Sequence, residues 1–119
     1  MSEVEQLTYK LSRAVMESEE YARYIQSYKA LAQYPSLMRE ANELRKNNFT
    51  LQNSDNFEGM FDRVEAFRRN YDELRKHEVV NDFLQAELCL SRMVQMIFNS
   101  IAGSIDFDID FLNDGGHNG

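Results

Sequence analysis

Apolar residues recur at alternating three- and four-residue intervals in three long stretches of this chain. Spacing of this kind aligns side chains in one stripe along a helix, as in helices that pack against other helices. The first stripe has one polar break, at Ser18. The residues of the three stripes, in order, are Val4, Leu7, Leu11, Ala14, Tyr21, Ile25 and Tyr28; Phe57, Met60, Val64, Phe67, Tyr71 and Leu74; and Val80, Phe83, Ala86, Leu90, Val94, Ile97 and Ile101. The pattern predicts an all-α fold.

Turn-forming residues divide the chain into four predicted helices. The first covers about residues 3–33, because Pro35 ends it and biases the preceding residue away from helical angles. The second begins at Pro35, since proline suits the first position of a helix. The polar run 53–56 favours a turn. Asp55 and Glu58 resemble a capping box, so the third helix is predicted to begin at the end of this run.

The apolar spacing slips by two residues between Leu74 and Val80, which rotates the apolar face. A kink or short turn is therefore predicted near residues 77–79. The fourth helix is predicted to run from there to about Ala102, with Gly103 as its C-terminal stop.

The C-terminal residues follow a different period. In residues 105–112 apolar and acidic side chains alternate, with Ile105, Phe107, Ile109 and Phe111 on one side and Asp106, Asp108 and Asp110 on the other. Alternation predicts a short extended segment that pairs with its copy in another chain or lies on helices. Residues 113–119 are expected to be a disordered tail. Residues 1–104 are predicted to form a coiled-coil-like bundle of four helices, whose first and last helices are long and amphipathic.

The composition narrows the class of protein. A domain of 119 residues leaves about a third of its unfolded surface exposed, so self-association would add burial. The net charge of −7 makes a poor surface for phosphates, so no direct nucleic-acid partner is expected. No apolar run reaches the roughly 18 residues of a membrane span, so no membrane association is expected. The acidic N-terminus and the single cysteine lead us to expect a cytoplasmic protein without a signal peptide.

Side chains that suit catalysis or metal binding are few. Cys89 lies beside the apolar stripe, which favours a buried structural thiol. The alternative is that the protein is a metal or iron–sulfur binding redox sensor that uses Cys89 from each subunit of an oligomer. His77 follows Glu73 by four residues but lacks the paired Glu-x-x-His motifs of two-metal bundles, which favours a helix-end position. The one basic cluster consists of Arg68, Arg69, Arg75 and Lys76 together with Arg45 and Lys46. Acids alternate with these residues at helical spacing, which favours solvated ion pairs over an RNA site. No catalytic, cofactor-binding or metal-binding residue is assigned.

Three segments together resemble the YlbF/YmcA family of bacterial regulatory proteins. They are residues 16–24 (MESEEYARY), 44–52 (LRKNNFTLQ) and 78–87 (EVVNDFLQAE), and their order and spacing match over about residues 5–103. The resemblance implies an all-helical, self-associating protein without enzymatic activity. It also implies a complex that influences mRNA processing by ribonuclease Y, and through it competence, sporulation and biofilm formation. Some relatives carry tail cysteines linked to iron–sulfur clusters, and this chain lacks them.

The leading hypothesis is a non-enzymatic, cytoplasmic regulatory scaffold without a cofactor. We expect a homo-oligomer, with a dimer favoured over a tetramer, whose exposed helix faces bind protein partners. The residues predicted to mediate packing or interaction are Tyr21, Ile25, Tyr28, Phe83, Leu90, Phe107, Ile109 and Phe111.

Overall fold

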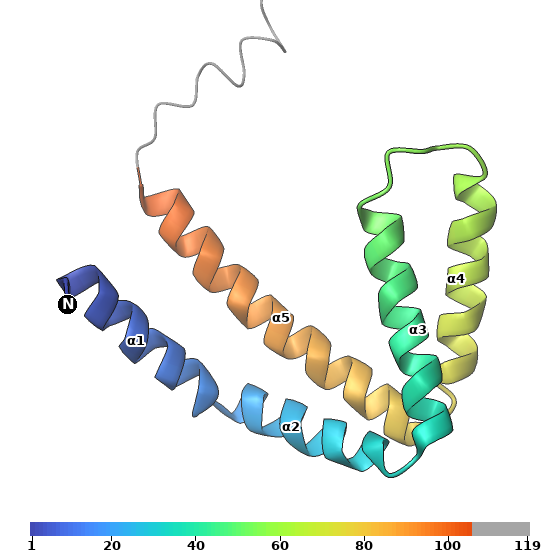
Figure 1. Ribbon diagram of the computed structural model, residues 1–119, viewed down its shortest axis with the longest axis horizontal. Helices are drawn as coiled ribbons and strands as arrows, with labels where there is room; N and C mark the ends of the chain where they lie inside the picture. The colour runs from blue at the N-terminus through green and yellow to red at the C-terminus, as the bar shows by residue number, and fades with distance from the viewer. Residues whose placement is uncertain (106–119) are drawn as a thin grey trace, which may run out of the picture.

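Five helices make up the part of the chain that the computed structural model describes, residues 1–105 (Figure 1). They are α1 (Glu3–Met16), α2 (Glu19–Ala32), α3 (Pro35–Gln52), α4 (Met60–Leu74) and α5 (Glu78–Ser104). No strand occurs within residues 1–105, so the all-α prediction is confirmed for them. The predicted number of helices, four, is wrong.

The additional helix comes from a break inside the predicted helix 3–33. Ser18 has extended backbone angles (φ −76°, ψ 158°), and its Oγ accepts a hydrogen bond of 3.2 Å from the backbone N–H of Tyr21. The same hydroxyl donates to the carbonyl of Val15 at 2.6 Å. A serine at an N-cap satisfies an otherwise unpaired helical N–H, so the chain gains by starting a new helix here. The polar break in the first stripe therefore separates two helices.

The connection between α3 and α4 is longer than predicted. Helix α3 begins at Pro35 as predicted, but α4 begins at Met60 and not near residue 56. Gly59, with φ 68°, occupies the N-cap position of α4, and no side chain caps that end. Left-handed angles strain most side chains but not glycine, so the helix begins after this residue. The predicted capping box does not form.

The turn predicted near residues 77–79 is confirmed. Helix α4 ends at Leu74, and His77 is the N-cap of α5. Helix α5 contains 27 residues and continues through Gly103 to Ser104, two residues beyond the predicted end. All of the predicted extended segment except Ile105, including Phe107, Ile109 and Phe111, lies outside the described residues.

The helices form two arms that meet at one end of the molecule (Figure 1). In one arm α2 packs against α5, with α1 continuing beyond α2; the other arm is the α3–α4 hairpin. The whole is flat, with extents of 48 × 43 × 18 Å. The core lies where the arms meet, and its fully or nearly buried side chains are Leu31, Ala41, Leu44, Val80, Phe83 and Leu84. The helices therefore form an open, two-armed arrangement around a small core.

Candidate functional site

The predicted positions on α2 are partly buried, and Tyr28 stays 43% exposed. The ring of Tyr28 lies 6.1 Å from that of Phe83 by centroid, and Phe83 is fully buried. Tyr21 and Ile25, also on α2, are half-buried, and Leu90 on α5 is half-buried too. Of the predicted α2 positions, the structure thus brings Tyr28 to Phe83, at the edge of the core.

Tyr24 belongs to this cluster, although it was not among the predicted positions. Its ring lies 5.6 Å from Phe83 and 6.5 Å from Tyr21. It stands three residues after Tyr21 and four before Tyr28, so it shares their helix face. That spacing was the signal in the sequence that could have identified it.

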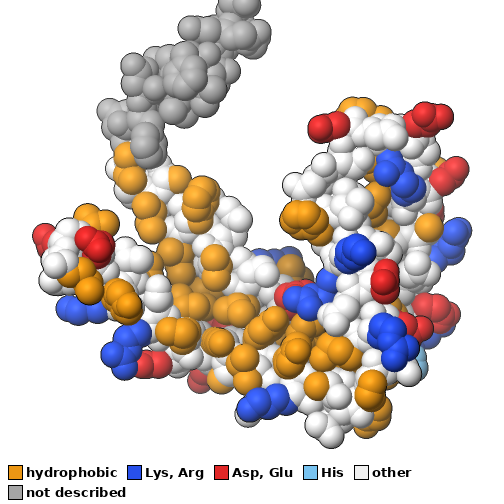
Figure 2. All heavy atoms as spheres, viewed as in Figure 1, with side chains coloured by type: hydrophobic (Ala, Val, Ile, Leu, Met, Phe, Trp, Pro, Cys, Tyr) orange, Lys and Arg blue, Asp and Glu red, His pale blue; other side chains and the backbone are white. Residues whose placement is uncertain are grey.

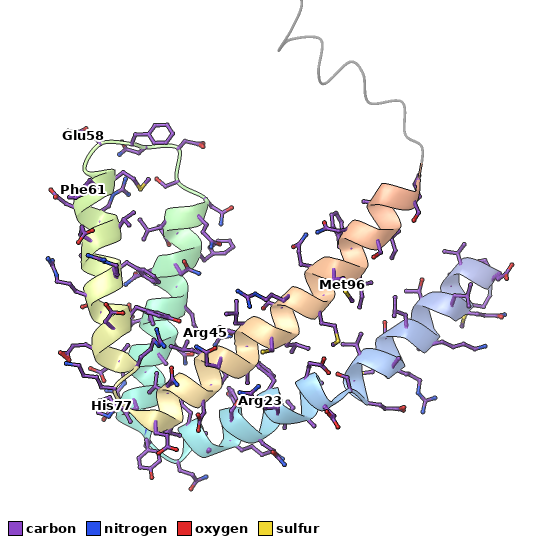
Figure 3. The ribbon with its side chains drawn as sticks, turned by 180° about the vertical axis from the view of Figure 1, so that it is seen from behind. Arg23, Arg45, Glu58, Phe61, His77 and Met96 are labelled. Carbon is purple, nitrogen blue, oxygen red and sulfur yellow. The ribbon has the colours of Figure 1, made fainter. Side chains whose placement is uncertain are left out.

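Arg45 joins the two arms. Its Nη2 lies 2.7 Å from Oε2 of Glu87 on α5, and its guanidinium lies over the ring of Phe83, 5.2 Å from the centroid (Figure 3). Both partners of the ion pair are partly exposed, so the pair contributes at most about 1 kcal/mol. It bridges α3 and α5 beside the buried core.

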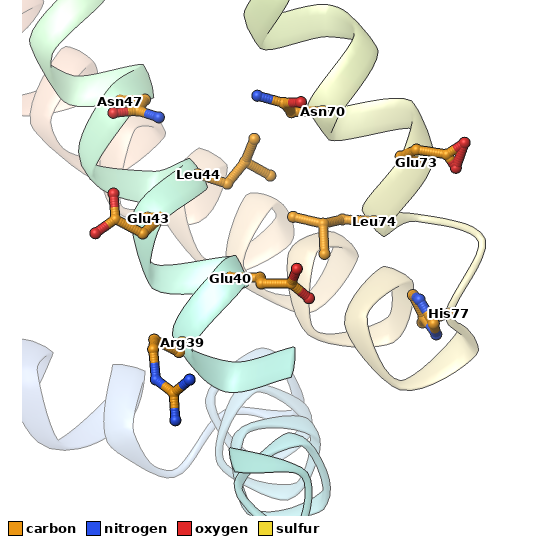
Figure 4. A pocket seen from close by; sticks show the side chains of 9 residues that line it. All are labelled: Arg39, Glu40, Glu43, Leu44, Asn47, Asn70, Glu73, Leu74 and His77. Carbon is orange, nitrogen blue, oxygen red and sulfur yellow. The ribbon is translucent and has the colours of Figure 1, made fainter. Parts of the chain in front are cut away.

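A polar groove lies between α3 and α4 near the junction of the arms (Figure 4). It is lined by Arg39, Glu40, Glu43, Leu44, Asn47, Asn70, Glu73, Leu74 and His77. His77 is exposed at the start of α5, which confirms its predicted helix-end position. Within the described residues, no three or more His, Cys, Asp or Glu side chains come together as a metal-binding group.

Cys89 is half-buried on α5, and Figure 3 shows Arg23, its neighbour from α2. Its Sγ lies 4.0 Å from Nη1 of Arg23. Both side chains line a second pocket with Glu19, Glu20, Arg92, Met93 and Met96. Along the sequence the nearest cation at helical spacing is Arg92, three residues after Cys89, whereas the packing of α2 on α5 brings Arg23 to the thiol. The use of Cys89 across subunits stays an untested alternative.

Three of the four basic residues between 68 and 76, in α4 and the turn after it, have polar partners. Arg68 bonds Glu65 at 2.9 Å and Lys76 bonds Glu73 at 3.0 Å, both at i, i+3 spacing. Arg75 donates to Oδ1 of Asn81 at 3.0 Å. The interleaved ion pairs predicted from the sequence are therefore confirmed at these positions.

Two exposed apolar stripes, that of α1 and the distal half of that of α5, lie in the same arm and are here together called the α1–α5 face. Its residues, with their exposed fractions, are Val4 (73%), Leu7 (54%), Leu11 (39%), Val94 (50%) and Ile101 (52%). Helix α1 has no buried residue at all. Figure 2 shows hydrophobic side chains at the surface of this arm. The sequence predicts that both stripes pack against other helices, and in these parts nothing within the described chain covers them.

A family model described as "Control of competence regulator ComK, YlbF/YmcA" matches residues 4–106. The match spans all five helices, including the α1–α5 face and both arms. Comparison with curated proteins and with solved structures gives no match. In the described part of the chain, no helix has the length and apolar character needed to cross a bilayer. The chain belongs to the YlbF/YmcA family, whose description as control of the competence regulator ComK marks it as regulatory.

Proposed function

We propose that this chain is a non-enzymatic regulatory scaffold that self-associates through the α1–α5 face and binds protein partners in that form. The observation that carries the proposal is α1: it is 14 residues long and buries no residue. Isolated helices of this length are marginal in water, because most helical stability in proteins comes from packing of the apolar face. A second copy of the chain would supply the missing contact.

The charges of α1 support a two-fold arrangement. Glu3 and Glu5 lie in its first turn, whereas Lys10 and Arg13 lie in its C-terminal half. Two copies of α1 packed antiparallel would place the acidic end of each beside the basic end of the other. A two-fold interface uses the same patch on both subunits, and this helix is self-complementary in that sense. A dimer is therefore the favoured state, with a tetramer as the alternative.

The family description supports a regulatory role, and we propose that the chain acts in the cytoplasm. By analogy with the family, the proposed role is in a complex that affects mRNA processing, competence, sporulation or biofilm formation. Affinity purification of the tagged chain from its host, followed by transcript analysis in a deletion strain, tests this role. Unchanged transcripts and competence in the deletion strain would argue against it.

Self-association is tested by sedimentation velocity at micromolar concentration. Leu7→Glu places a charge within the apolar stripe of α1 and should shift the chain from dimer to its 14.0 kDa monomer. Ser12→Glu adds the same charge to the same helix outside the stripe, and should leave the dimer intact. Neither position is buried, so the core should remain folded by circular dichroism. A wild-type chain that sediments as a monomer refutes the proposal.

A further inference from the structure

The end of the α3–α4 hairpin farthest from the core carries a second apolar surface, here called the tip patch: Phe57, Phe61 and Val64. Phe57 and Phe61 are 80% and 77% exposed, more than any other large hydrophobic side chain in residues 1–105. Phe61 and Val64 are three residues apart on α4 and so share a helix face. Figure 3 shows Phe61 on the side of α4 that faces away from α3. Two nearly fully exposed Phe side chains at one end of a hairpin are unusual in a soluble chain and favour an interaction site.

Hydrogen bonds hold the loop that carries Phe57 and leads into α4, where Phe61 lies. The guanidinium of Arg63 donates to the backbone carbonyls of Asn56 and Glu58. The side-chain Oδ1 of Asn56 accepts from the backbone N–H of Glu58 at 3.0 Å, and Oγ of Ser54 accepts from the backbone N–H of Asn56 at 3.3 Å. Such bonds reduce the conformational entropy that binding would otherwise cost. The patch is therefore preorganised for contact.

The charge around the tip patch is negative. Residues 49–64 contain three acids, Asp55, Glu58 and Asp62, and one base, Arg63. Arg63 directs its guanidinium at backbone carbonyls of the loop. Figure 2 shows acidic side chains on either side of hydrophobic ones at this end of the molecule. A partner that covers the patch gains most if basic side chains flank its own apolar surface.

We propose that the tip patch binds an amphipathic helix of another protein, whose apolar stripe is flanked by Lys and Arg. Exposed aromatic side chains are frequent anchors of protein interfaces, and helix-on-helix contact is a common recognition mode. The site is separate from the α1–α5 face and gives the proposed scaffold a specific class of partner. A second copy of the chain fits the tip patch less well. Its basic side chains Arg23 and Arg92 line a pocket that also contains the acidic Glu19 and Glu20, so that surface is not purely basic.

The test uses two fluorescent amphipathic peptides with the same leucine stripe, one flanked by lysines and the other by glutamates. Binding to the full chain is measured by fluorescence anisotropy. We expect the lysine peptide to bind and the glutamate peptide not to bind. The double variant Phe57→Ser, Phe61→Ser should weaken binding roughly tenfold or more, which corresponds to about 1.4 kcal/mol. Because both rings are exposed, this variant should keep the helix content of the wild type.

Two further variants make the result specific. The triple variant Asp55→Asn, Glu58→Gln, Asp62→Asn should weaken binding of the lysine peptide and flatten its salt dependence. Leu7→Glu should leave peptide binding unchanged, so that loss of self-association and loss of tip binding are distinguishable. Equal binding of the lysine peptide to the wild type and to the double Phe variant overturns the proposal. So does a double Phe variant that sediments at lower mass, because the tip would then be a contact between copies.

Discussion

Replacing Phe83 by alanine tests where the stability of this small molecule resides. Phe83 is fully buried where the two arms meet, with the rings of Tyr24 and Tyr28 at 5.6 and 6.1 Å and the guanidinium of Arg45 over its face. A buried Phe removes about 150–250 Å² from water, worth roughly 4–6 kcal/mol at about 25 cal/mol per Å². Alanine keeps the Cβ, so the expected loss is about 3–5 kcal/mol, the usual range for Phe→Ala in a core.

That loss is a large share of the roughly 5–15 kcal/mol that stabilises a typical domain. Urea denaturation followed by circular dichroism measures it, at a concentration where the chain is dilute enough to avoid association. Phe61→Ala is the matched control: it deletes the same atoms from a side chain that is 77% exposed, and should change the free energy of unfolding by no more than about 0.5 kcal/mol. If both substitutions cost the same, the ring of Phe83 is not a central part of the core and the reasoning fails.

Three further predictions concern the breaks in the helices and the C-terminus. Ser18→Ala removes the cap of α2 and should lower the free energy of unfolding by about 0.5–2 kcal/mol in urea, whereas Ser27→Ala, within the same helix, should be near neutral; equal effects would contradict the capping role. Gly59→Ala should destabilise by about 1–2 kcal/mol because of its positive φ, whereas Gly103→Ala, inside α5, should stabilise by up to about 1 kcal/mol; the two melting temperatures should therefore move in opposite directions. A chain that ends at Ser104 should melt earlier or form smaller oligomers than the full chain, because it loses the four apolar side chains of the alternating segment; identical melting and sedimentation would mean that the segment contributes nothing to association.

Local signals in the sequence identified the helices well. Pro35 marks the start of α3, and the phase slip before Val80 marks the turn ahead of α5, because both act through the backbone of neighbouring residues. The break at Ser18 was visible as a polar residue within the stripe. It was missed because one serine inside a periodic stretch is compatible both with a continuous helix and with a cap.

The spacing of residues along the sequence could not predict contacts between distant segments. In the sequence Arg45 is one member of a basic cluster, and Arg92 is the cation closest to Cys89 at helical spacing. The structure places Arg45 against Glu87 and brings Arg23 to the thiol. Each pairing depends on how α2 and α3 pack on α5. Helical periodicity gives the face of the helix on which a residue lies, but not which residue of another helix lies against that face.

The sequence by itself determined that the chain is helical, where most helices begin and end, and which face of each is apolar. Only the tertiary structure decided which part of each stripe is covered. The stripe of α5 is buried at Val80 and Phe83 but exposed at Val94 and Ile101, although the spacing is the same throughout. The physical reason is that amphipathicity is a property of one helix, whereas burial needs a second surface. In the described chain α2 and the hairpin supply that surface at one end of α5, and they do not reach its other end.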